Sequence, residues 1–508
     1  MHAQSCTIGV DLGTTSVKAV AVDRDGHEIA SASQPIALIN RHEGEAEQDA
    51  FAVATAANHA LASTVSDACA AGYEVARVGL SAAMHSLLPI NTQGRPMANA
   101  MIWMDVRAAP QAEELWSSPE GKALYERTGT PIHAMSPLCK LLWLRQNQPE
   151  IFQRAARFVS LKEWVWHHWF NAWEVDTSIA SATGLFNLRE HTWDAEALRI
   201  AGISAEQLSR LMPTTFHRTN VNERMLLEAG LSDETTFVIG ASDGVLANLA
   251  AGVISNEQMV LTIGTSCAVR SGTTTPVTDP ATRSFCYVLG DNYFIAGSPS
   301  NSGGIVLDWL YHKVLSSGIL STTAHAMDAL VTEARDARDD DLLCLPYIAG
   351  ERGPLWNAGA SGVFLGLRLE HTGAHLMRAA IEGILFNSYW MASGLFERLG
   401  RPARIIASGN VLKEEWIRQL AADIYSVPVA AIGEVDASTL GAALIANIGC
   451  GLLNWEETAR QQGALVHSVT QPSGNDGYRR KFERYRTLTG ALTTQLADVY
   501  LPHTMRQG

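Results

Sequence analysis

The chain has 508 residues, more than one compact hydrophobic core usually holds, which predicts two domains of similar size. Hydrophobic residues make up 47% and charged residues 18% of the sequence, a balance that excludes a disordered chain. The net charge of -14 and the lack of a basic run in the sequence argue against nucleic acid and anionic membranes as partners.

The first predicted elements are two strands joined by a glycine turn. Residues 7–11 and 17–23 are rich in apolar and β-branched side chains, and GTTS (residues 13–16) lies between them. An alanine-rich helix is predicted next, over residues 49–71, and a buried strand over residues 75–82. Strands that alternate with helices indicate an α/β architecture.

The glycine turn within GVDLGTTSVK (residues 9–18) has the features of a phosphate-binding loop. Its hydroxyl and ammonium donors are Thr14, Thr15, Ser16 and Lys18. Asp11, directly before the turn, is a candidate ligand for a divalent cation. The segment is not a P-loop, because it lacks GxxxxGK[ST], and a plain hairpin explains it equally well when it is taken alone.

Two segments that mix polar and aromatic groups each follow a predicted strand. They are SAAMHS (residues 81–86) and WMDVR (residues 103–107). Polyols are bound by such mixtures, because hydroxyl groups need hydrogen-bond partners and C–H groups pack against an aromatic face. Taken separately, either segment could equally be an ordinary surface loop.

The second half of the chain repeats part of the N-terminal pattern. A strand over residues 237–240 leads to Asp243 at the start of a helix, and a strand over residues 259–264 runs into Gly264-Thr265-Ser266. The segment TIGTS resembles DLGTTS near the N-terminus, which indicates two related halves with a boundary near residue 245. Two such turns that face one cleft can hold a triphosphate from both sides.

Asp243 has two interpretations. An Asp at the start of a helix is most often an N-cap, whose carboxylate accepts backbone N–H groups of the first turn. At the edge of a cleft, the same carboxylate can accept the proton of an attacking hydroxyl during phosphoryl transfer. The two roles are compatible, since a helix start at a cleft exposes the carboxylate.

Three later features carry less information about function. A strand over residues 405–410 is predicted to run into a glycine turn and a helix over residues 413–426. His371 and His375 stand four residues apart, but no third zinc ligand is evident, so a zinc site is not predicted. Arg352 could form a structural ion pair or reach the cleft, and the sequence leaves both open.

Together these segments resemble the FGGY carbohydrate kinases, a family within the actin/hexokinase/Hsp70 ATPase superfamily. The resemblance runs from residue 9 to about Cys450. MSPLCKLLWLRQN (residues 135–147) is similar to the first family signature, and GVFLGLRLEHTGAHLMRAAIE (residues 362–382) to the second. ASGNVLKEEWIRQLAADIYSVPV (residues 407–429) is similar to the adenosine segment, with Ser408 where many members have a second glycine.

Within the family, the resemblance is strongest to the gluconokinase subgroup. It rests on TGTPIHAMSPL (residues 128–138), SATGLFNL (residues 181–188), GASDGVLANLAAG (residues 240–252) and LPYIAGERGPLWNAGASGVFLGL (residues 345–367). Xylulokinases share the Met-His pair and the GER motif, and are therefore the nearest competitor.

The resemblance implies an α/β fold of two related ribonuclease H-like domains, of the actin/hexokinase/Hsp70 type, with an interdomain cleft. Residues 1–245 would form the N-terminal domain, with the sugar-binding side and the first phosphate motif. Residues 246–508 would form the C-terminal domain, with the second phosphate motif and the adenosine site. ATP is the implied co-substrate and Mg²⁺ the implied cation.

The resemblance also implies a role for individual residues. Asp243 matches the catalytic base and, together with Asp11, a metal position. The residues expected on the sugar side are Met84, His85, Trp103, Asp105, Arg107 and His133. Those expected at ATP and its phosphates are Thr14, Thr15, Ser16, Lys18, Gly264, Thr265, Gly304, Gly409, Asn410 and Lys413.

The expected reaction is direct in-line phosphorylation of a primary hydroxyl of a sugar acid, D-gluconate to 6-phosphogluconate. The alternative is a pentulose or polyol kinase on the same scaffold. A nucleotide-driven protein of the actin/Hsp70 type and a silent sugar sensor fit less well, because the chain carries both a polyol pocket and the catalytic carboxylates. Candidates for the group that meets a substrate carboxylate are Arg107, His133, Lys140 and Arg352.

The sequence also bears on where the protein works. Its seven cysteines are scattered without a CxxC pair, as expected for reduced and mostly buried thiols. The N-terminal residues lack the charged and apolar regions of a signal peptide, and no apolar run reaches the ~20 residues of a membrane span. We therefore expect a cytoplasmic enzyme, and the resemblance adds a homodimer.

Overall fold

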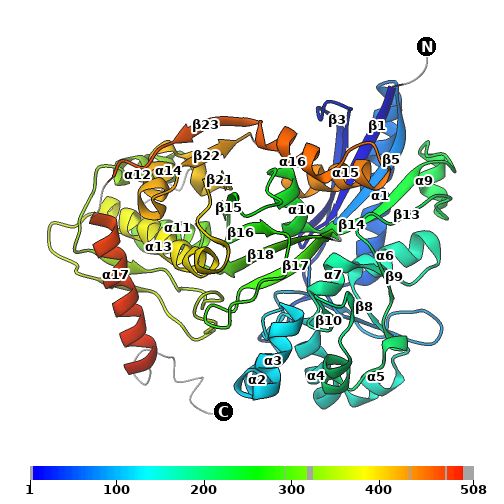
Figure 1. Ribbon diagram of the computed structural model, residues 1–508, viewed down its shortest axis with the longest axis horizontal. Coiled ribbons are helices and arrows are strands. Elements are labelled where there is room, and N and C mark those ends of the chain that lie inside the picture. The colour runs from blue at the N-terminus through cyan, green and yellow to red at the C-terminus, as the bar shows by residue number, and fades with distance from the viewer. Residues whose placement is uncertain (1–3, 291, 317–323, 434–435, 475–476, 496–508) are drawn as a thin grey trace.

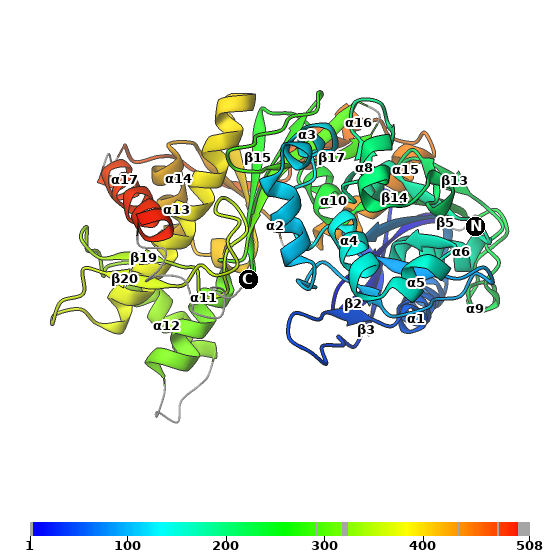
Figure 2. The same cartoon turned by 90° about the horizontal axis from the view of Figure 1, so that it is seen from below.

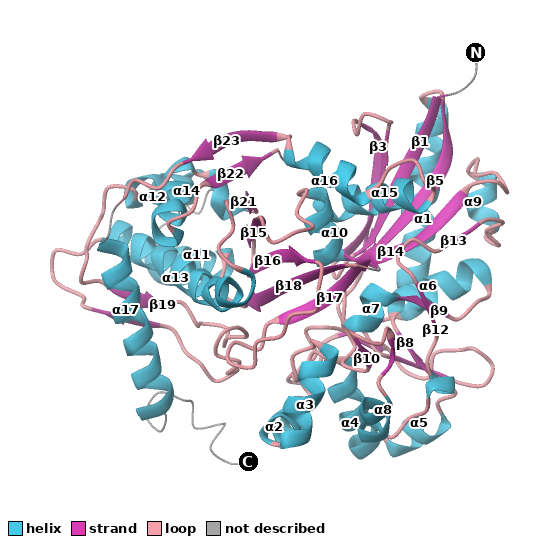
Figure 3. Ribbon diagram, viewed as in Figure 1, coloured by secondary structure: helices cyan, strands magenta, loops and turns pink. Residues whose placement is uncertain are grey.

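The computed structural model describes residues 4–290, 292–316, 324–433, 436–474 and 477–495. Two β-sheets with helices packed on them form two lobes that lie side by side (Figures 1 and 2). Helices and strands both occur throughout the molecule (Figure 3), in agreement with the predicted α/β architecture. None of the described helices combines the length and the hydrophobicity that a bilayer crossing requires.

Each lobe is built on one sheet. Among the described residues, the first sheet has six strands, in the order β13 (His217–Arg218), β14 (Thr236–Ser242), β5 (Tyr73–Ala82), β1 (Gln4–Leu12), β2 (Ser16–Val22) and β3 (Glu28–Pro35). The second has seven, in the order β17 (Phe285–Gly290), β18 (Tyr293–Ser300), β16 (Cys267–Thr273), β15 (Gln258–Ile263), β21 (Arg404–Ser408), β22 (Val429–Ile432) and β23 (Val466–Thr470).

The two sheets share one arrangement of strands. β1 is antiparallel to β2 and parallel to β5, and β5 is parallel to β14. In the second sheet, β15 is antiparallel to β16 and parallel to β21, and β21 is parallel to β22. Five strands therefore correspond in order and direction, β14-β5-β1-β2-β3 with β22-β21-β15-β16-β18. The prediction of two related halves, made from two short glycine motifs, is confirmed.

The helices that pack on the sheets come from both halves of the chain. They are α1 (Ala50–Ala70), α6 (Leu161–Phe170), α10 (Asp243–Ala250), α13 (Gly373–Leu399), α14 (Glu415–Tyr425) and α15 (Ala437–Gly449). Asp49 is the N-cap of α1, as predicted, and accepts the backbone N–H groups of Phe51 and Ala52. Both views place α10 between the two sheets (Figures 1 and 2).

Shorter elements fill the rest of the described chain. In the first half they are β4 (Glu47–Gln48), β6 (Leu88–Ile90), β7 (Ala100–Met101), α2 (Ala109–Ser117), α3 (Pro119–Thr128), α4 (Pro137–Asn147), α5 (Pro149–Arg154), β8 (Arg157–Val159), β9 (Glu174–Asp176), α7 (Thr177–Ser181), β10 (Phe186–Asn187), β11 (Thr192–Trp193), α8 (Ala195–Ala201), η1 (Ala205–Gln207), β12 (Arg210–Met212) and α9 (Arg224–Glu228). In the second half they are α11 (Gly304–Trp309), η2 (Leu310–Leu315), α12 (Ala324–Ala334), β19 (Leu343–Leu345), β20 (Val363–Leu365), η3 (Asn410–Lys413), α16 (Trp455–Gly463), α17 (Gly477–Gly490) and η4 (Ala491–Gln495).

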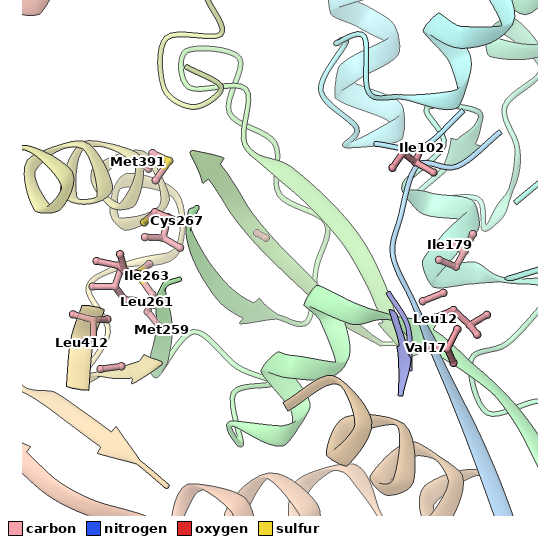
Figure 4. Close-up of a cluster of buried hydrophobic side chains, with 14 of the residues drawn as sticks. Leu12, Val17, Ile102, Ile179, Met259, Leu261, Ile263, Cys267, Met391 and Leu412 are labelled. Carbon is pink, nitrogen blue, oxygen red and sulfur yellow. The ribbon is translucent and has the colours of Figure 1, made fainter. Parts of the chain in front are cut away.

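Hydrophobic side chains hold both strand hairpins in place. Leu12 and Val17 lie at the ends of β1 and β2, and Leu261 and Ile263 lie on β15; all four are nearly inaccessible to solvent. Figure 4 shows them in two separate groups, one on each sheet. The turns that follow β1 and β15 therefore extend from rigid, buried strands rather than from mobile loops.

Helix α15 belongs to the second half of the sequence but packs on the first sheet. Its backbone comes so close to β1 and β5 that a side chain does not fit between them. A Cβ atom on Gly9 would lie 1.9 Å from the carbonyl oxygen of Thr439, and one on Gly79 would lie 1.9 Å from that of Ala442. The Asn447 side chain adds a polar contact, accepting the hydroxyl of Thr7 and the Nε of Arg77. A boundary at residue 245 thus leaves one helix of the second half on the sheet of the first.

This close packing predicts the effect of one added methyl group. We expect Gly79→Ala to lower the free energy of unfolding by about 1–3 kcal/mol, the usual cost of overpacking, because the new Cβ meets a backbone carbonyl that cannot rotate away. Urea unfolding followed by circular dichroism measures the loss. In the control, Gly463→Ala, the new Cβ has no neighbour nearer than 3.9 Å. Equal unfolding midpoints for the two variants would contradict this account of α15.

Candidate active site

Each half has one glycine turn that is closed by a backbone hydrogen bond. The backbone N–H of Gly13 donates to the carbonyl of Ser16 at 3.1 Å, and that of Gly264 to the carbonyl of Ser266 at 3.0 Å. Around Gly264, a Cβ would meet no atom within 4 Å, so the turn faces open space. The N–H groups of both glycines are used within the turns, so the exposed hydroxyls of Thr15 and Thr265 are the donors available to phosphate oxygens.

The predicted phosphate residues of the second half lie together. The N–H of Gly304, the first residue of α11, donates to the carbonyl of Gly264 at 2.7 Å, and that of Ile305 to the carbonyl of Thr265 at 3.1 Å. Gly409 has a φ of 90°, and its Cα packs so close that a Cβ would lie 2.4 Å from the carbonyl of Ile263. One surface is therefore formed by the turn, the start of α11 and the segment after β21.

The segment after β21 differs slightly from its predicted form. The helix expected from residue 413 begins at Glu415, and the intervening residues form η3, where Asn410 and Lys413 are exposed. Ser408, the departure from the family pattern, is hydrogen-bonded through its hydroxyl to that of Thr262 at 2.8 Å. The strand ends are thus tied together behind the Gly264 turn.

On the first hairpin, the predicted phosphate residues have different surroundings. Thr14 accepts the indole N–H of Trp103 on its hydroxyl at 2.9 Å and the Gln48 amide on its carbonyl at 2.7 Å, which ties the turn to the WMDVR segment. Thr15 is exposed and Ser16 begins β2. Lys18 forms an ion pair at 2.9 Å with Asp436, the N-cap of α15.

Asp11 and Asp243 lie near each other at the junction of the two halves. Asp11 accepts the hydroxyl of Ser81 at 2.6 Å. Burial and the charge of Asp243 raise the pKa of Asp11 to about 7, although Ser81 and Lys18 act in the opposite direction. Burial also raises the pKa of Asp243, against the opposing effects of the Gly244 N–H and of Arg270. Two carboxylates with raised pKa values form an anionic pair that a divalent cation would stabilise, and oxygen ligands suit Mg²⁺.

The N-cap interpretation of Asp243 is corrected by the structure. Ser242 occupies the cap position, and Asp243 is the first residue of α10. Its Oδ1 accepts the N–H of Gly244 at 2.6 Å. The helix start therefore uses only part of the hydrogen-bonding capacity of the carboxylate, and the remainder is available to a ligand.

Next to Asp243, residues from both halves line a cavity of about 150 Å³. Those that matter most here are Met84, His85, Trp103, Asp243, Arg270, Tyr287 and Arg352. Two of its polar atoms, the Tyr287 hydroxyl and the Arg270 Nε, are buried without a hydrogen-bond partner among the described residues. An unpaired buried polar atom costs ~1–3 kcal/mol, so the cavity is suited to a polar ligand.

His85 is held as a neutral hydrogen-bond acceptor. Its Nδ1 lies 2.7 Å from the carbonyl oxygen of Ala182, and a carbonyl can only accept, so Nδ1 carries the proton and Nε2 is free to accept one. Burial, reinforced by the charge of Lys140, lowers the pKa of His85 to about 3. A neutral Nε2 at a cavity wall can accept the hydrogen of a substrate hydroxyl.

Three other predicted sugar-side residues do not line the cavity. Asp105 is fully buried and forms a bidentate pair with Arg107, whose guanidinium also bonds to Glu47 at 2.5 Å and stacks over Trp143. His133 accepts the N–H of Met135 on Nδ1 and packs edge-on against Trp356. The first two hold the WMDVR segment from behind, and only Trp103 of that segment borders the cavity.

The structure places Arg352 in the cavity and adds Arg270, which the sequence analysis missed. Arg352 donates from Nε to the Asn301 side chain at 2.8 Å and from one Nη to the Ser300 carbonyl at 3.1 Å, and its guanidinium lies 5.4 Å from the centre of the Trp103 ring. Burial lowers the pKa of both arginines, and neither has a carboxylate within salt-bridge distance among the described residues. The one signal for Arg270 in the sequence is a charge within the apolar strand CAVRSGT.

Comparisons with known proteins agree with this geometry. The N-terminal domain of the FGGY family of carbohydrate kinases matches residues 6–250, and its C-terminal domain matches residues 259–450. The chain belongs to the FGGY family of carbohydrate kinases. This FGGY kinase is 37% identical over 505 residues to a gluconokinase of Bacillus subtilis (strain 168), covering 97% of this chain and 98% of that protein.

Two solved structures are similar over almost the whole chain. A ligand-bound xylulose kinase from Lactobacillus acidophilus superposes with a TM-score of 0.91, and a gluconate kinase from the same organism with 0.90; each is 31% identical and covers 98% of this chain and 99% of its own. The fold is thus the actin/hexokinase type, with two ribonuclease H-like halves, and the enzyme is a carbohydrate kinase. Similarity over the whole chain therefore does not distinguish a gluconate kinase from a xylulose kinase.

Burial of Asp11, together with the charge of Asp243, predicts a pH-dependent cost to stability. The folded pKa of Asp11, about 7, lies above its ordinary value of 3.8, so its contribution to stability is complete below about pH 4 and is lost as the pH rises through 7. We expect Asp11→Asn to abolish activity yet raise Tm at pH 8 by roughly 2–4 °C per kcal/mol relieved, with a smaller gain toward pH 4. Thermal unfolding without divalent cations measures this.

Asp25→Asn is the matched control, because the Asp25 side chain is 66% exposed. It removes a carboxylate from the same half of the chain and should leave Tm unchanged at both pH values. A destabilised Asp11→Asn variant at pH 8 would show that the charge of Asp11 does not destabilise the unliganded fold.

Proposed function

We propose that this FGGY kinase transfers the γ-phosphoryl group of ATP to a primary hydroxyl of a sugar acid, D-gluconate, to give 6-phosphogluconate. The observation that carries the choice of a sugar acid is the pair Arg270 and Arg352, two partly buried guanidinium groups that line one cavity and form no salt bridge among the described residues. The charge of Asp243 acts on Arg270 and that of Glu351 on Arg352, but neither carboxylate is in direct contact. A carboxylate on the substrate would supply a direct ion-pair partner. The similarity to the gluconokinase of Bacillus subtilis supports the same choice.

Asp243 acts as the general base in this proposal. It lines the cavity and starts α10, and burial raises its pKa toward the range in which a carboxylate accepts a proton efficiently near neutral pH. It takes the proton of the substrate hydroxyl while that oxygen attacks the γ-phosphorus in line with the leaving oxygen of ADP. No covalent intermediate with the protein is formed.

The phosphate groups of ATP lie between the two glycine turns in this proposal. The Gly13 and Gly264 turns and the start of α11 border the phosphates, and the exposed hydroxyls of Thr15 and Thr265 are the donors, with the adenosine near Gly409 and Asn410. Asp11 and Asp243 are the residues that would hold Mg²⁺, which neutralises charge on the phosphoryl oxygens when it is bound. The two halves, residues 1–245 and 246–508 with α15 returning to the first sheet, close around the reacting groups and exclude water.

The sugar chain contacts the wall formed by the first half. His85 accepts a substrate hydroxyl on Nε2, the ring of Trp103 packs against C–H groups, and Met84 fills the apolar side next to Gly244. The far end of the substrate then meets the arginines of the second half. Asp105 and Arg107 fix the Trp103 segment without touching substrate.

The alternative is a pentulose or polyol kinase. The similarity to the xylulose kinase of Lactobacillus acidophilus favours it, since that structure superposes as well as the gluconate kinase does. A neutral ketose would leave both guanidinium groups without a salt-bridge partner. A substrate panel of gluconate, xylulose, ribulose, glycerol and erythritol, assayed by ADP release, separates the two. Turnover of a neutral sugar with none of gluconate would favour the alternative.

Substitution of the base tests the mechanism. We expect Asp243→Asn to keep the fold and ATP binding and to lose ~10²–10⁴-fold in kcat, the contribution typical of general base catalysis. A coupled ADP-release assay gives kcat, and titration with a fluorescent ATP analogue gives the Kd. Wild-type turnover by this variant would rule out Asp243 as the base.

Removal of the cavity arginines tests the choice of a sugar acid. We expect Arg270→Met and Arg352→Met each to lower kcat/KM for gluconate by about 10–100-fold, from the ~1.5–3 kcal/mol of a charged hydrogen bond, and to lower it much less for xylulose. Arg107→Met is the control, because it removes a buried arginine outside the cavity lining. It should lower stability and leave the ratio of the two kcat/KM values unchanged. An unchanged ratio in all three variants would contradict carboxylate recognition by Arg270 and Arg352.

A further inference from the structure

Lys140 lies behind the proposed sugar site, on the apolar helix α4, and is fully buried. Its Nζ donates to three backbone carbonyl oxygens: that of His85 at 2.6 Å, that of Ile102 at 2.7 Å and, more weakly, that of Met101 at 3.4 Å. An ammonium group has three N–H donors, so the set of carbonyls matches its full capacity. Lys140, one of the candidates for a contact with the substrate carboxylate, does not line the cavity and points its ammonium group at the protein backbone.

The surroundings of Lys140 differ from those of the other buried lysines. Among the described residues, Lys162 pairs with Asp176 at 2.8 Å and Lys481 with Glu382 at 2.6 Å, whereas Lys140 has no carboxylate within salt-bridge distance. Burial of a charge without a counter-ion is costly, and burial lowers the pKa of Lys140 to about 7. The packing of α4 alone does not explain why a lysine, rather than an apolar residue, occupies this buried position.

The three carbonyls belong to the two segments that form the sugar wall. His85 is in SAAMHS and has a φ of 69°, a left-handed backbone that costs a residue with a side chain roughly 1–2 kcal/mol. Met101 and Ile102 immediately precede Trp103, which places the indole ring at the cavity. One ammonium group thus joins the residue that supplies Nε2 to the residue that leads into the aromatic wall.

The backbone hydrogen bonds near this junction leave the His85 carbonyl dependent on Lys140. Leu87 and Met101 exchange two backbone hydrogen bonds, at 2.9 and 3.0 Å, which align the two segments next to the cavity. The Ile102 carbonyl also accepts the backbone N–H of Asp105 at 3.0 Å, whereas among the described residues no backbone N–H donates to the buried carbonyl of His85. An unpaired buried carbonyl is costly, so the His85 carbonyl would move toward water if the ammonium were removed, and its link to Ile102 would be lost.

We propose that Lys140 is a positioning residue that holds the His85 and Trp103 segments in the arrangement needed to bind the sugar. This inference rests on the proposed sugar site, and it concerns how that site is kept in shape before substrate arrives. Pre-organisation of this kind lowers the cost of ordering two loops on binding, and a displacement of about 1 Å can reduce turnover by ~10²-fold.

Lys140→Met tests the proposal, since methionine fills similar space without donors. We expect KM for the accepted sugar to rise and kcat to fall, so that kcat/KM drops by at least about 10-fold, while the Kd for a fluorescent ATP analogue stays within about twofold. Lys481→Met is the matched control, because it removes a buried ammonium group in the other half. It should lower Tm and leave both kinetic constants within about twofold.

A second variant tests the proposal if Lys140→Met does not fold. Lys140→Gln keeps two N–H donors without a charge, and should show the same selective loss of sugar binding to a smaller extent. Wild-type KM and kcat in a folded Lys140 variant would overturn the proposal. So would equal losses of ATP and sugar binding, because they indicate a general structural defect.

Failure of the sugar site itself gives a different result. Trp103→Ala should raise KM for whichever sugar the wild-type enzyme phosphorylates. If this variant keeps a wild-type KM, the proposed sugar wall is wrong. If Trp103→Ala raises KM and a folded Lys140→Met does not, the wall is right and only the positioning role of Lys140 fails.

Discussion

The contact between α15 and the first sheet is the constraint on which the site depends. Gly9 and Gly79 leave no room for a side chain, so the helix backbone rests directly on β1 and β5. Asp11 follows Gly9 by two residues on β1, and α15 packs against α10, which begins with Asp243. Because each carboxylate is attached to an element locked by this packing, their separation is set by backbone contacts rather than by flexible side chains.

The same packing places the like charges of Asp11 and Asp243 near each other, which costs electrostatic free energy in the unliganded enzyme. In the second half, the charge of Arg270 disfavours that of Arg352. Ligands of opposite charge would relieve both, which would couple their binding to the stability of the fold.

The sequence predicted those features that depend on local patterns. Both glycine hairpins, the strand before Asp243 and the capped helix after Asp49 follow from residue types at short spacing, and their positions are confirmed. The pairing of Arg107 with Glu47 and the buried contacts of Lys140 depend on segments far apart in the chain, which periodicity cannot reveal. Arg270 was missed because one charge in an apolar strand is not a motif.

The segment between the corresponding strands is much longer in the first half than in the second, and the residues of the candidate site are distributed accordingly. In the first half, residues 83–235 lie between β5 and β14, where the second half has only the segment that contains η3 and α14. That insertion supplies His85, Trp103 and Lys140, whereas both glycine turns lie outside it. Exchange of this segment between relatives would replace one wall of the proposed sugar cavity while the two glycine turns stay intact. Arg270 and Arg352 would remain, so under the proposed function an enzyme with an exchanged wall would keep its preference for an anionic substrate.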